Sequence, residues 1–162
     1  MAFESELLAL LPRLRRFARS LTYDPADADD LCQAALERAL KARDSWTEGT
    51  RLDSWMYRIM RNLHIDQARA RNRAARTFMP EEAGEHVGHA GDRDVENVVV
   101  LGDVGRAMAQ LPQEQREAVA LVLVEGLAYK DAADILDIPM GTLTSRLVRG
   151  RQALMDMMGE AA

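Results

Sequence analysis

The sequence predicts an all-α protein of two small helical domains joined by a flexible acidic linker, with a helix-turn-helix as the second domain. Three observations support this fold class. Helix-favouring Ala, Leu, Met and Arg are abundant, whereas aromatic residues make up 5% of the chain. Apolar residues recur at steps of three and four in several segments. Residues 77–94 separate these segments, since they are acidic, contain three glycines and show no apolar period.

The bulk composition narrows the class of protein further. The 162 residues, 48% hydrophobic and 29% charged, are enough for one domain or two small ones. A single cysteine, Cys32, excludes an internal disulfide framework and a multi-cysteine zinc site. No apolar run approaches the roughly 18 residues of a membrane span, and no signal peptide is recognisable at the N-terminus. We therefore expect a cytoplasmic protein with no membrane partner.

The charge is unevenly distributed along the chain, although the net charge is −5. Residues 1–76 carry 14 basic and 11 acidic side chains, whereas residues 77–103 carry one Arg and seven acids. Basic side chains concentrate in two places, residues 58–76 and residues 146–151. The acidic total therefore does not exclude a nucleic-acid partner.

Two helices are predicted before residue 45. The first covers residues 4–21, where Pro12 should either begin the regular part of the helix or kink it. The second should begin at Pro25, because Asp24 can cap its free amide groups and Pro25 suits the first helical position, and should end near Ala42. Its buried face would be formed by Leu31, Ala35, Leu36, Ala39 and Leu40, and its exposed face would be acidic.

Residues 52–76 form the helix around which the first half is organised. Leu52, Trp55, Met56, Ile59 and Leu63 give it an apolar stripe, and Arg58, Arg61, Asn62 and Arg69 fall on the other side. Residues 54–80 hold six arginines and a single acid. The basic side is either an ordinary solvated face or a surface for an anionic partner.

The loop before this helix, residues 44–51, contains Trp46. Trp46 either covers the core or offers a stacking surface for an unpaired base. The sequence does not decide between these two roles, although the first is the commoner one for a tryptophan.

Four helices are predicted in the second half. They are predicted from about Val95 to Leu111, from Pro112 to Gly126, over residues 129–136 and from Met140 to about Met157, with a turn at residues 137–139. Two short helices, a tight turn and a third element with basic residues are typical of a helix-turn-helix. The inward side chains of the last helix should be Met140, Leu143, Leu147, Leu154 and Met158.

The opposite face of that last helix carries side chains that can read base edges: Thr144, Ser145, Val148, Arg149 and Gln152. Arginine pairs with guanine, glutamine with adenine, and valine can contact a thymine methyl group. Arg146 flanks the apolar stripe, and we expect it to pair with Asp131, with a phosphate contact as the alternative.

No catalytic constellation is recognisable. The sequence shows no pairing of a nucleophile with a base and no glycine-rich phosphate loop. His86 and His89 lie three apart in the acidic stretch, but no other ligands accompany them. We therefore expect no metal, no cofactor and no enzymatic activity.

Two segments resemble the group IV, or extracytoplasmic-function, family of bacterial RNA polymerase sigma factors. In the first half the resemblance is carried by residues 27–33 (DADDLCQ) and 55–59 (WMYRI), together with Asn62, Asp66 and Arg69. In the second half it is carried by residues 111–118, 126–129 and 138–147, with Ala133, Arg149 and Arg151. The two segments are in the order and spacing of the family's second and fourth conserved regions.

The resemblance implies a division of the chain and its partners. Residues 1–76 would bind core polymerase and the promoter minus-ten element, residues 77–94 would be the linker, and residues 95–162 would bind the minus-thirty-five element. Core RNA polymerase would be contacted through the coiled coil of its largest subunit, by Asp30, Gln33 and Glu37. The remaining partners would be promoter DNA and an anti-sigma factor.

The same resemblance implies two sets of DNA-binding residues. The minus-ten set is Trp46, Arg58, Arg61, Asn62 and Arg69, in which the loop around Trp46 would capture a flipped base. The minus-thirty-five set is Thr142, Thr144, Ser145, Val148, Arg149, Arg151 and Gln152.

Four positions depart from the family pattern. Ala34 replaces a frequent Glu in the polymerase-binding segment, and Thr144 stands where many members have Lys or Arg. Gly150 replaces a usual Ala and is expected to weaken its helix by about 1 kcal/mol. Ala128 replaces a usual Ser or Thr, which removes a helix cap worth about 1 kcal/mol.

A sigma-like decoy that titrates an anti-sigma factor is the alternative function. Such a decoy needs no base-reading face, so the retained Arg58, Arg61, Asn62 and Arg149 argue against it.

Overall fold

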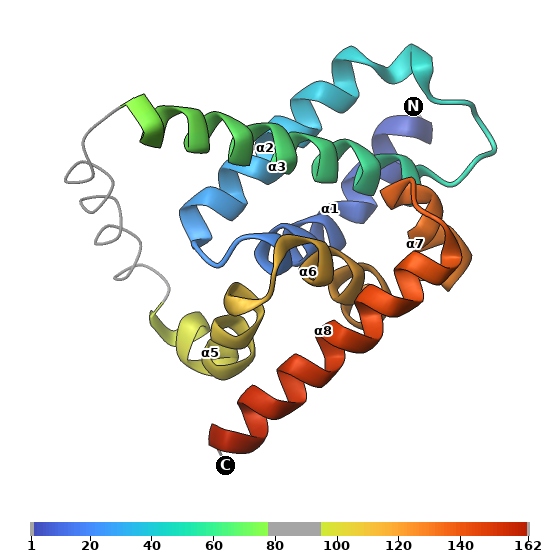
Figure 1. The fold of residues 1–162 in the computed structure, drawn as a ribbon. Helices are drawn as coiled ribbons and strands as arrows, with labels where there is room; N and C mark the ends of the chain where they lie inside the picture. Colours follow the sequence, from blue (N-terminus) through green and yellow to red (C-terminus); the bar gives the residue numbers. More distant parts are fainter. Residues whose placement is uncertain (1, 78–94, 162) are drawn as a thin grey trace.

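Two sets of helices pack face to face, with one set drawn from each half of the chain (Figure 1). The computed structural model describes residues 2–77 and 95–161. The first half contains α1 (Ala2–Leu21), α2 (Pro25–Lys41), the 3-10 helix η1 (Arg43–Ser45) and α3 (Leu52–Thr77). The second half contains α5 (Val95–Gln110), α6 (Gln113–Val119), the π-helical turn η3 (Ala120–Val124), α7 (Tyr129–Leu136) and α8 (Met140–Ala161). The all-α prediction is confirmed, and the predicted flexible linker falls, apart from Thr77, outside the described residues.

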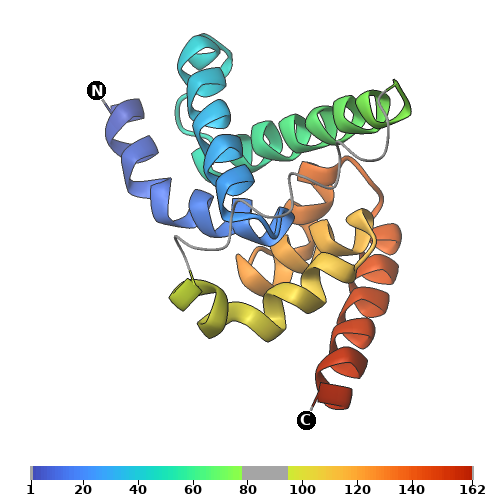
Figure 2. The same cartoon turned by 90° about the vertical axis from the view of Figure 1, so that its left-hand side faces the viewer.

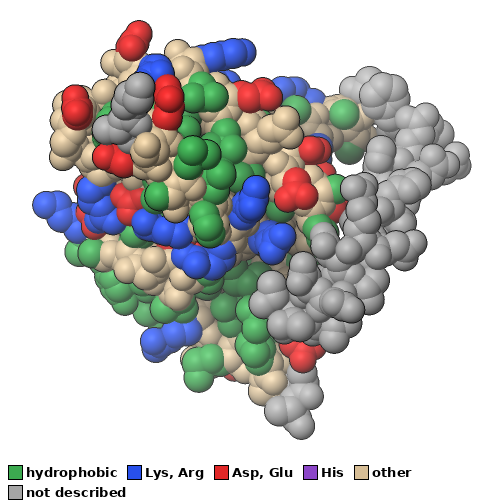
Figure 3. All heavy atoms as spheres, turned by 180° about the vertical axis from the view of Figure 1, so that it is seen from behind, with side chains coloured by type: hydrophobic (Ala, Val, Ile, Leu, Met, Phe, Trp, Pro, Cys, Tyr) green, Lys and Arg blue, Asp and Glu red, His purple; other side chains and the backbone are tan. Residues whose placement is uncertain are grey.

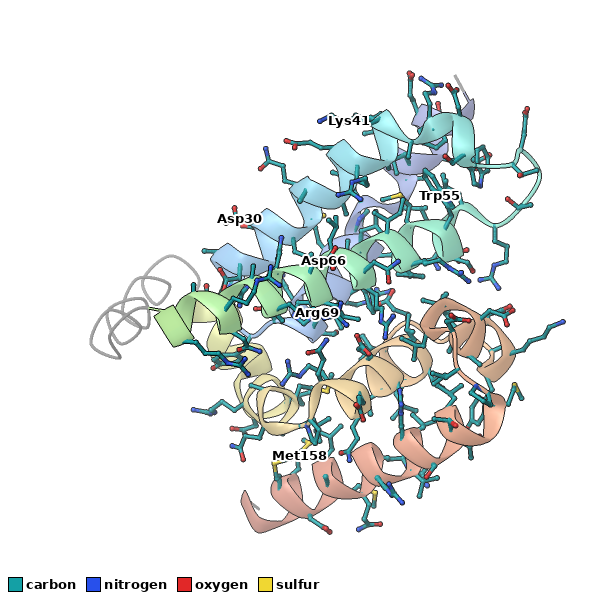
Figure 4. All side chains as sticks on the ribbon, turned by 45° about the horizontal axis from the view of Figure 1, so that its top comes forward. Asp30, Lys41, Trp55, Asp66, Arg69 and Met158 are labelled. Carbon is teal, nitrogen blue, oxygen red and sulfur yellow. The ribbon has the colours of Figure 1, made fainter. Side chains whose placement is uncertain are left out.

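In the first half, α2 and α3 run antiparallel and α1 packs against both (Figures 1 and 4). The predicted start of α2 is confirmed, since the Asp24 side chain accepts a hydrogen bond from the backbone N–H of Ala26 at 2.9 Å and Pro25 is the first helical residue. Helix α1 continues through Pro12. Cys32 is a buried free cysteine in the core face of α2.

In the second half, α8 lies across α5, α6 and α7. The predicted helix-turn-helix is present as α7, a turn and α8. Asp137 makes the turn in the left-handed conformation, with φ 56° and ψ 50°, and its backbone N–H donates to carbonyls of the preceding helical turn. The predicted helix from Pro112 to Gly126 divides into α6 and the π-helical turn η3.

Gly150, which was expected to weaken its helix, also has a role in packing that helix propensity does not include. It is buried where α8 crosses α6, and a Cβ at this position would lie 2.9 Å from Cγ2 of Val119 and 3.3 Å from the carbonyl oxygen of Gln115. A glycine is therefore what allows the two helices to approach this closely.

The two halves contact each other extensively. Helix α1 packs against α5, α6 and η3, and α3 packs against α7 (Figure 2). Buried side chains from both halves belong to one continuous apolar cluster. The helices of the two halves thus share an interface as well as having their own packing.

This interface explains why the apolar stripe predicted for α3 was incomplete. Tyr57 and Met60 are fully buried although neither belonged to that stripe, whereas Trp55, Ile59 and Leu63 are only partly buried. The reason is that α3 packs on two sides, against the first half and against α7. Three side chains predicted to face inward are exposed, since they lie at helix ends beyond the packed surface: Leu40, Met140 and Met158.

Within the described ranges, no helix has the length and apolar character needed to cross a membrane.

Candidate nucleic-acid interface

Helix α3 places the predicted minus-ten residues along one helix, but the second half already engages two of them. Arg58 is exposed, and its Nη2 donates to the backbone carbonyl of Asp134 at 2.6 Å. Arg61 is partly covered, and its Nε donates to Oε2 of Glu117 at 3.2 Å. The predicted basic face is therefore also a contact surface between the two halves.

Asn62 and Arg69 lie on α3 as exposed side chains. Figure 4 labels Arg69 close to Asp66 on α3. Asn62 Oδ1 lies 3.5 Å from Nη1 of Arg61, at the limit of a hydrogen bond. Both side chains are accessible to a ligand that approaches this end of α3.

Trp46 lies just after η1 and packs on Phe3, with ring centroids 5.5 Å apart. It is partly buried against the core, and its Nε1 has no hydrogen-bond partner among the described residues. This environment favours the first of the two roles considered for Trp46, a lid on the core. A base-stacking role for Trp46 stays a prediction.

Helix α8 presents the predicted minus-thirty-five residues on its outer face. Thr144, Ser145, Val148, Arg149, Arg151 and Gln152 are exposed and Thr142 is half-buried. The most exposed apolar member is Val148, at 55%. Leu143 and Leu147 are buried on the opposite side of the helix, so the apolar stripe fixes the direction of the polar face.

Two of these side chains form hydrogen bonds within α8. The Thr144 hydroxyl donates to the carbonyl of Met140 at 2.9 Å, and the Gln152 amide donates to Oδ1 of Asp156 at 2.9 Å. Both contacts are exposed and are of a kind that exchanges readily with water or a base edge.

The residues proposed to contact polymerase, Asp30, Gln33 and Glu37, are exposed on α2. They lie opposite the buried face formed by Leu31, Cys32, Ala35 and Ala39. Figure 4 shows Asp30 on the side of the molecule away from the second half. This surface is therefore open for a partner.

Arg146 does not pair with Asp131, contrary to expectation. Asp131 accepts a hydrogen bond from Nη1 of Arg51, in the loop before α3. Arg146 instead lies where its charge, together with Arg61, opposes the rise in pKa that burial causes at Glu117. The expectation was wrong because Arg51 of the first half pairs with Asp131, and no local pattern indicates that the two halves pack together.

A buried polar network was missed by sequence reasoning. Glu125 has a fully buried side chain that accepts hydrogen bonds from Arg16 and from the Tyr57 hydroxyl. Burial, together with Glu125, raises the pKa of Tyr57 well above its usual value. Glu117 is also buried, which raises the pKa of its carboxyl although Arg61 opposes the shift. An acid within an apolar helical segment was the only available signal.

The N-terminus of α3 carries a second cluster of charges. Asp53 accepts hydrogen bonds from Arg13 at 2.8 Å and from Arg51 at 2.9 Å. Burial raises its pKa, but the arginines and the backbone N–H of Ser54 outweigh this effect and leave the pKa lowered. The cluster fixes the loop that carries Trp46 relative to α1 and α3.

The surface opposite the view of Figure 1 shows Lys and Arg side chains in a band across its middle, with acidic groups beside it (Figure 3). Within the described part of the chain, no three His, Cys, Asp or Glu side chains are grouped so that they could hold a metal ion. His86 and His89 lie outside the described residues.

Comparison with known proteins identifies the family to which the chain belongs. Residues 7–74 match the model of Sigma-70 region 2, and residues 101–154 match that of Sigma-70, region 4. The ECF RNA polymerase sigma factor EcfG of Rhodopseudomonas palustris is 36% identical over 153 residues, 94% of this chain and 83% of the relative. The ECF RNA polymerase sigma factor SigC of Mycobacterium tuberculosis is 34% identical over 157 residues, 95% of this chain and 82% of the relative.

Solved structures agree with these relatives. The sigma factor RpoE of Bartonella quintana, crystallised with the anti-sigma factor NepR, is similar at a TM-score of 0.81 and 33% identity, over 98% of this chain and 97% of that chain. The fold of CnrH, solved with the cytosolic domain of CnrY, is similar at a TM-score of 0.74 and 20% identity, over 99% of this chain and 90% of that chain. The chain belongs to the ECF subfamily of RNA polymerase sigma factors.

Proposed function

We propose that the protein is a dissociable promoter-recognition subunit that binds core RNA polymerase and directs it to specific promoters. It would act without enzymatic activity, metal or cofactor, because polymerase performs the chemistry. The observation that carries this proposal is the presence, in one member of the family, of two separate surfaces suited to DNA, one on α3 and one on α8. Its expected location is the cytoplasm.

The first half, residues 1–76, is proposed to open and hold the minus-ten element. Arg58, Arg61 and Arg69 would contact phosphates, and Asn62 has an amide that can pair with a base edge. Trp46 would contribute by stacking on an extruded base, which requires its ring to leave Phe3.

The second half, residues 95–162, is proposed to read the minus-thirty-five element through α8. Arg149 and Gln152 are the residues whose side chains can pair bidentately with bases, and Val148 can contact a thymine methyl group. Thr142, Thr144, Ser145 and Arg151 would position the helix in the major groove.

The exposed acidic face of α2 is proposed to bind the coiled coil of the largest polymerase subunit through Asp30, Gln33 and Glu37. Ala34 lies among these residues and offers no charge, so the contact rests on the other three. The relative RpoE was crystallised with an anti-sigma factor, and we propose that an anti-sigma factor regulates this chain as well.

The test is to add the purified protein to core RNA polymerase and to measure binding and run-off transcription together. A sigma factor is expected to bind core enzyme and to start RNA at defined positions. A decoy would bind an anti-sigma factor but would start no RNA. The triple variant D30N/Q33A/E37Q should lose core binding, whereas E114Q, which neutralises an exposed acid of the second half, should keep it.

A further inference from the structure

Most of the hydrogen bonds between the two halves run in one direction. Arg116 of the second half is an exception, since its Nη1 donates to the carbonyl of Leu21 at 2.9 Å. The first half supplies donors, namely Arg16, Arg51, Arg58, Arg61 and the Tyr57 hydroxyl. The second half supplies the acceptors, which are three carboxylates and one backbone carbonyl: Glu117, Glu125, Asp131 and the carbonyl of Asp134. The ion pairs themselves all place the cation on the first half and the carboxylate on the second, which makes the two sides electrostatically complementary, as is found between separate binding partners.

Glu125 accepts more of these hydrogen bonds than any other acceptor at the interface of the described residues. Its Oε2 accepts from Nε of Arg16 at 2.8 Å, and its Oε1 accepts from Nη2 of Arg16 at 2.8 Å and from the Tyr57 hydroxyl at 2.7 Å. The guanidinium and the carboxylate are therefore paired in the bidentate geometry that is the strongest for such groups. The side chain of Glu125 is fully buried. All three of its hydrogen bonds come from the first half, so they would be lost if the halves separated.

The position of Glu125 depends on the π-helical turn. The backbone N–H of Glu125 donates to the carbonyl of Ala120, five residues earlier, at 2.9 Å. The π-helical turn contains one residue more than a regular α-helical turn. Without that extra residue, the residues after it would be rotated by about 100° around the helix axis, and Glu125 would no longer point at Arg16. The chain then turns sharply at Gly126, which has a φ of +74°. π-Helical turns are often found at functional positions.

Two donors on the same interface belong to the proposed minus-ten surface. Arg58 donates to the carbonyl of Asp134, and Arg61 donates to Glu117. Arg58 also lines an open pocket of about 410 Å³ between α3 and the helix-turn-helix, formed with Asp134, Asp137 and Pro139. The donor groups held in these contacts, Nη2 of Arg58 and Nε of Arg61, are not available to a DNA phosphate at the same time.

We propose that the second half is an intramolecular inhibitor of the first: Glu125 holds the halves closed, and closure withdraws Arg58 and Arg61 from the minus-ten element. This inference rests on the proposed function, because it assumes that these two arginines bind DNA. In the closed form the outer face of α8 stays free, while Arg58 and Arg61 of the α3 surface are engaged by the second half, so the two DNA-binding surfaces differ in availability.

The polar contacts are expected to specify the closed form more than to stabilise it. Buried ion pairs repay little more than their desolvation cost, so they specify an arrangement without stabilising it strongly. Glu117 illustrates this balance, since burial raises the pKa of its carboxyl despite the neighbouring Arg61. DNA or polymerase would open the interface by offering alternative partners to these groups and by covering the apolar side chains that the two halves share.

The direct test is the distance between the halves in solution. Spin labels would be placed at A70C on α3 and M155C on α8, both exposed positions, in a C32A background. The closed form predicts one narrow distance distribution for the otherwise unaltered chain. E125Q should broaden it and shift it to longer distances, because an amide offers one acceptor and places a donor against Arg16.

Two further variants make the result decisive. R16Q removes the other partner of the ion pair and should have the same effect as E125Q. Because the Arg16 side chain is half-exposed, R16Q remains informative if E125Q lowers the helix content measured by circular dichroism. E114Q removes an exposed carboxylate from the same half and should leave the narrow distribution intact. A broad distribution in the unaltered chain, or a narrow one in both E125Q and R16Q, would overturn the proposal.

DNA binding gives a second readout. If the closed form holds about nine-tenths of the molecules, E125Q should bind a fluorescein-labelled, mixed-sequence 20-nucleotide single strand about tenfold more tightly. E114Q, with the same change of charge, should differ from the unaltered protein by about twofold or less. Equal affinities of E125Q and E114Q would contradict inhibition by the second half.

Run-off transcription separates this inference from the proposed function. Transcription by the unaltered protein together with an E125Q distance distribution that stays narrow would reject the latch and leave the sigma function intact. An opened E125Q variant that starts no RNA with core enzyme, like the unaltered protein, would reject the function and leave the conformational result standing.

Discussion

At the scale of single residues, the buried His64 makes the stability of the fold depend on pH. It lies on α3 at 6% exposure, and its Nδ1 has no hydrogen-bond partner among the described residues. Burial, followed by the charges of Arg116 and Arg71, lowers its pKa from 6.5 to about 4. The unfolded chain therefore binds the proton more readily than the folded chain between these two pH values.

The expected consequence is a loss of stability on acidification. The contribution of His64 is fully present above pH 6.5 and is lost as the pH falls towards 4, by up to about 3 kcal/mol. H64L has no titrating group, so the difference in unfolding free energy between the two proteins should change over this window. Urea unfolding followed by circular dichroism at pH 7, 5.5 and 4 measures it, and a constant difference would show that His64 is not protonated differently in the two states.

Glu117 titrates in the opposite sense. Burial raises the pKa of Glu117, so the folded chain binds this proton more tightly than the unfolded chain. The resulting stabilisation is fully present below the ordinary pKa of 4.5 and is lost as the pH rises through the raised pKa. Comparison of H64L with the unaltered chain cancels this effect, because Glu117 is present in both.

Arg149 carries the prediction for promoter reading. Its side chain is exposed on the outer face of α8, beside Val148 and Gln152. R149A should cost about 1–3 kcal/mol of discrimination at one base pair of the upstream element. Binding of holoenzyme to a promoter and to its single-base variants measures this. K130A removes a charge of the same half and should weaken all sequences equally, and the same uniform loss in R149A would assign Arg149 to phosphate.

At the scale of elements, the helices and the helix start at Asp24 were predictable because their signals are local. Apolar spacing, capping residues and prolines act over one or two turns. Which side of a helix is buried was less predictable when two neighbours share it. Tyr57 is a core residue because its ring packs on Phe17 of α1, with centroids 5.0 Å apart, and its hydroxyl donates to Glu125 of the second half. Nothing near Tyr57 in the chain indicates the contact with Glu125. The π-helical turn was also missed, since its apolar residues fit an α-helix equally well.

Gly150 provides the prediction for the packing of α8 on α6. Helix propensity alone would make G150A stabilising by about 1 kcal/mol. The new methyl group would instead meet Val119 at 2.9 Å and Gln115 at 3.3 Å, and overpacking costs about 1–3 kcal/mol. We expect a net loss of unfolding free energy of about 1 kcal/mol. G159A lies on the same helix with nothing within 4 Å of the new Cβ, and it should be neutral or stabilising. A more stable G150A would show that the helices can move apart without cost.

Ala128 provides the prediction for the start of α7. It is the N-cap residue, its backbone is extended, and no side-chain hydrogen bond caps the helix. A hydroxyl at this position can accept a hydrogen bond from the first turn, so A128T should raise the unfolding free energy by about 1 kcal/mol. A128V has nearly the same shape without the hydroxyl and should not. Equal thermal or denaturant midpoints for the two variants would contradict the capping argument.

At the scale of the whole molecule, the association of the two halves could not be predicted. Its contacts join residues that are far apart in the chain, such as Arg16 with Glu125 and Arg51 with Asp131, and no periodic pattern marks such pairs. The candidate site shows the same division. The outer face of α8 follows from the spacing of Leu143 and Leu147, whereas the engagement of Arg58 and Arg61 follows only from the packed arrangement.

The packed arrangement also connects the proposed function with its regulation. The polymerase surface on α2 and the upstream reading face on α8 are open, whereas the minus-ten surface on α3 is partly covered by the second half. A molecule of this kind would find polymerase first and expose its minus-ten surface afterwards. This order is a consequence of the inferred latch and would not hold without it.

The most direct test of the central claim is run-off transcription by core RNA polymerase with the purified protein, on a library of templates with randomised upstream sequence. The account predicts RNA that begins at defined positions, with the productive templates enriched for two separated sequence elements, one for each half of the protein. RNA synthesis that is no more template-specific than that of core enzyme alone would contradict it.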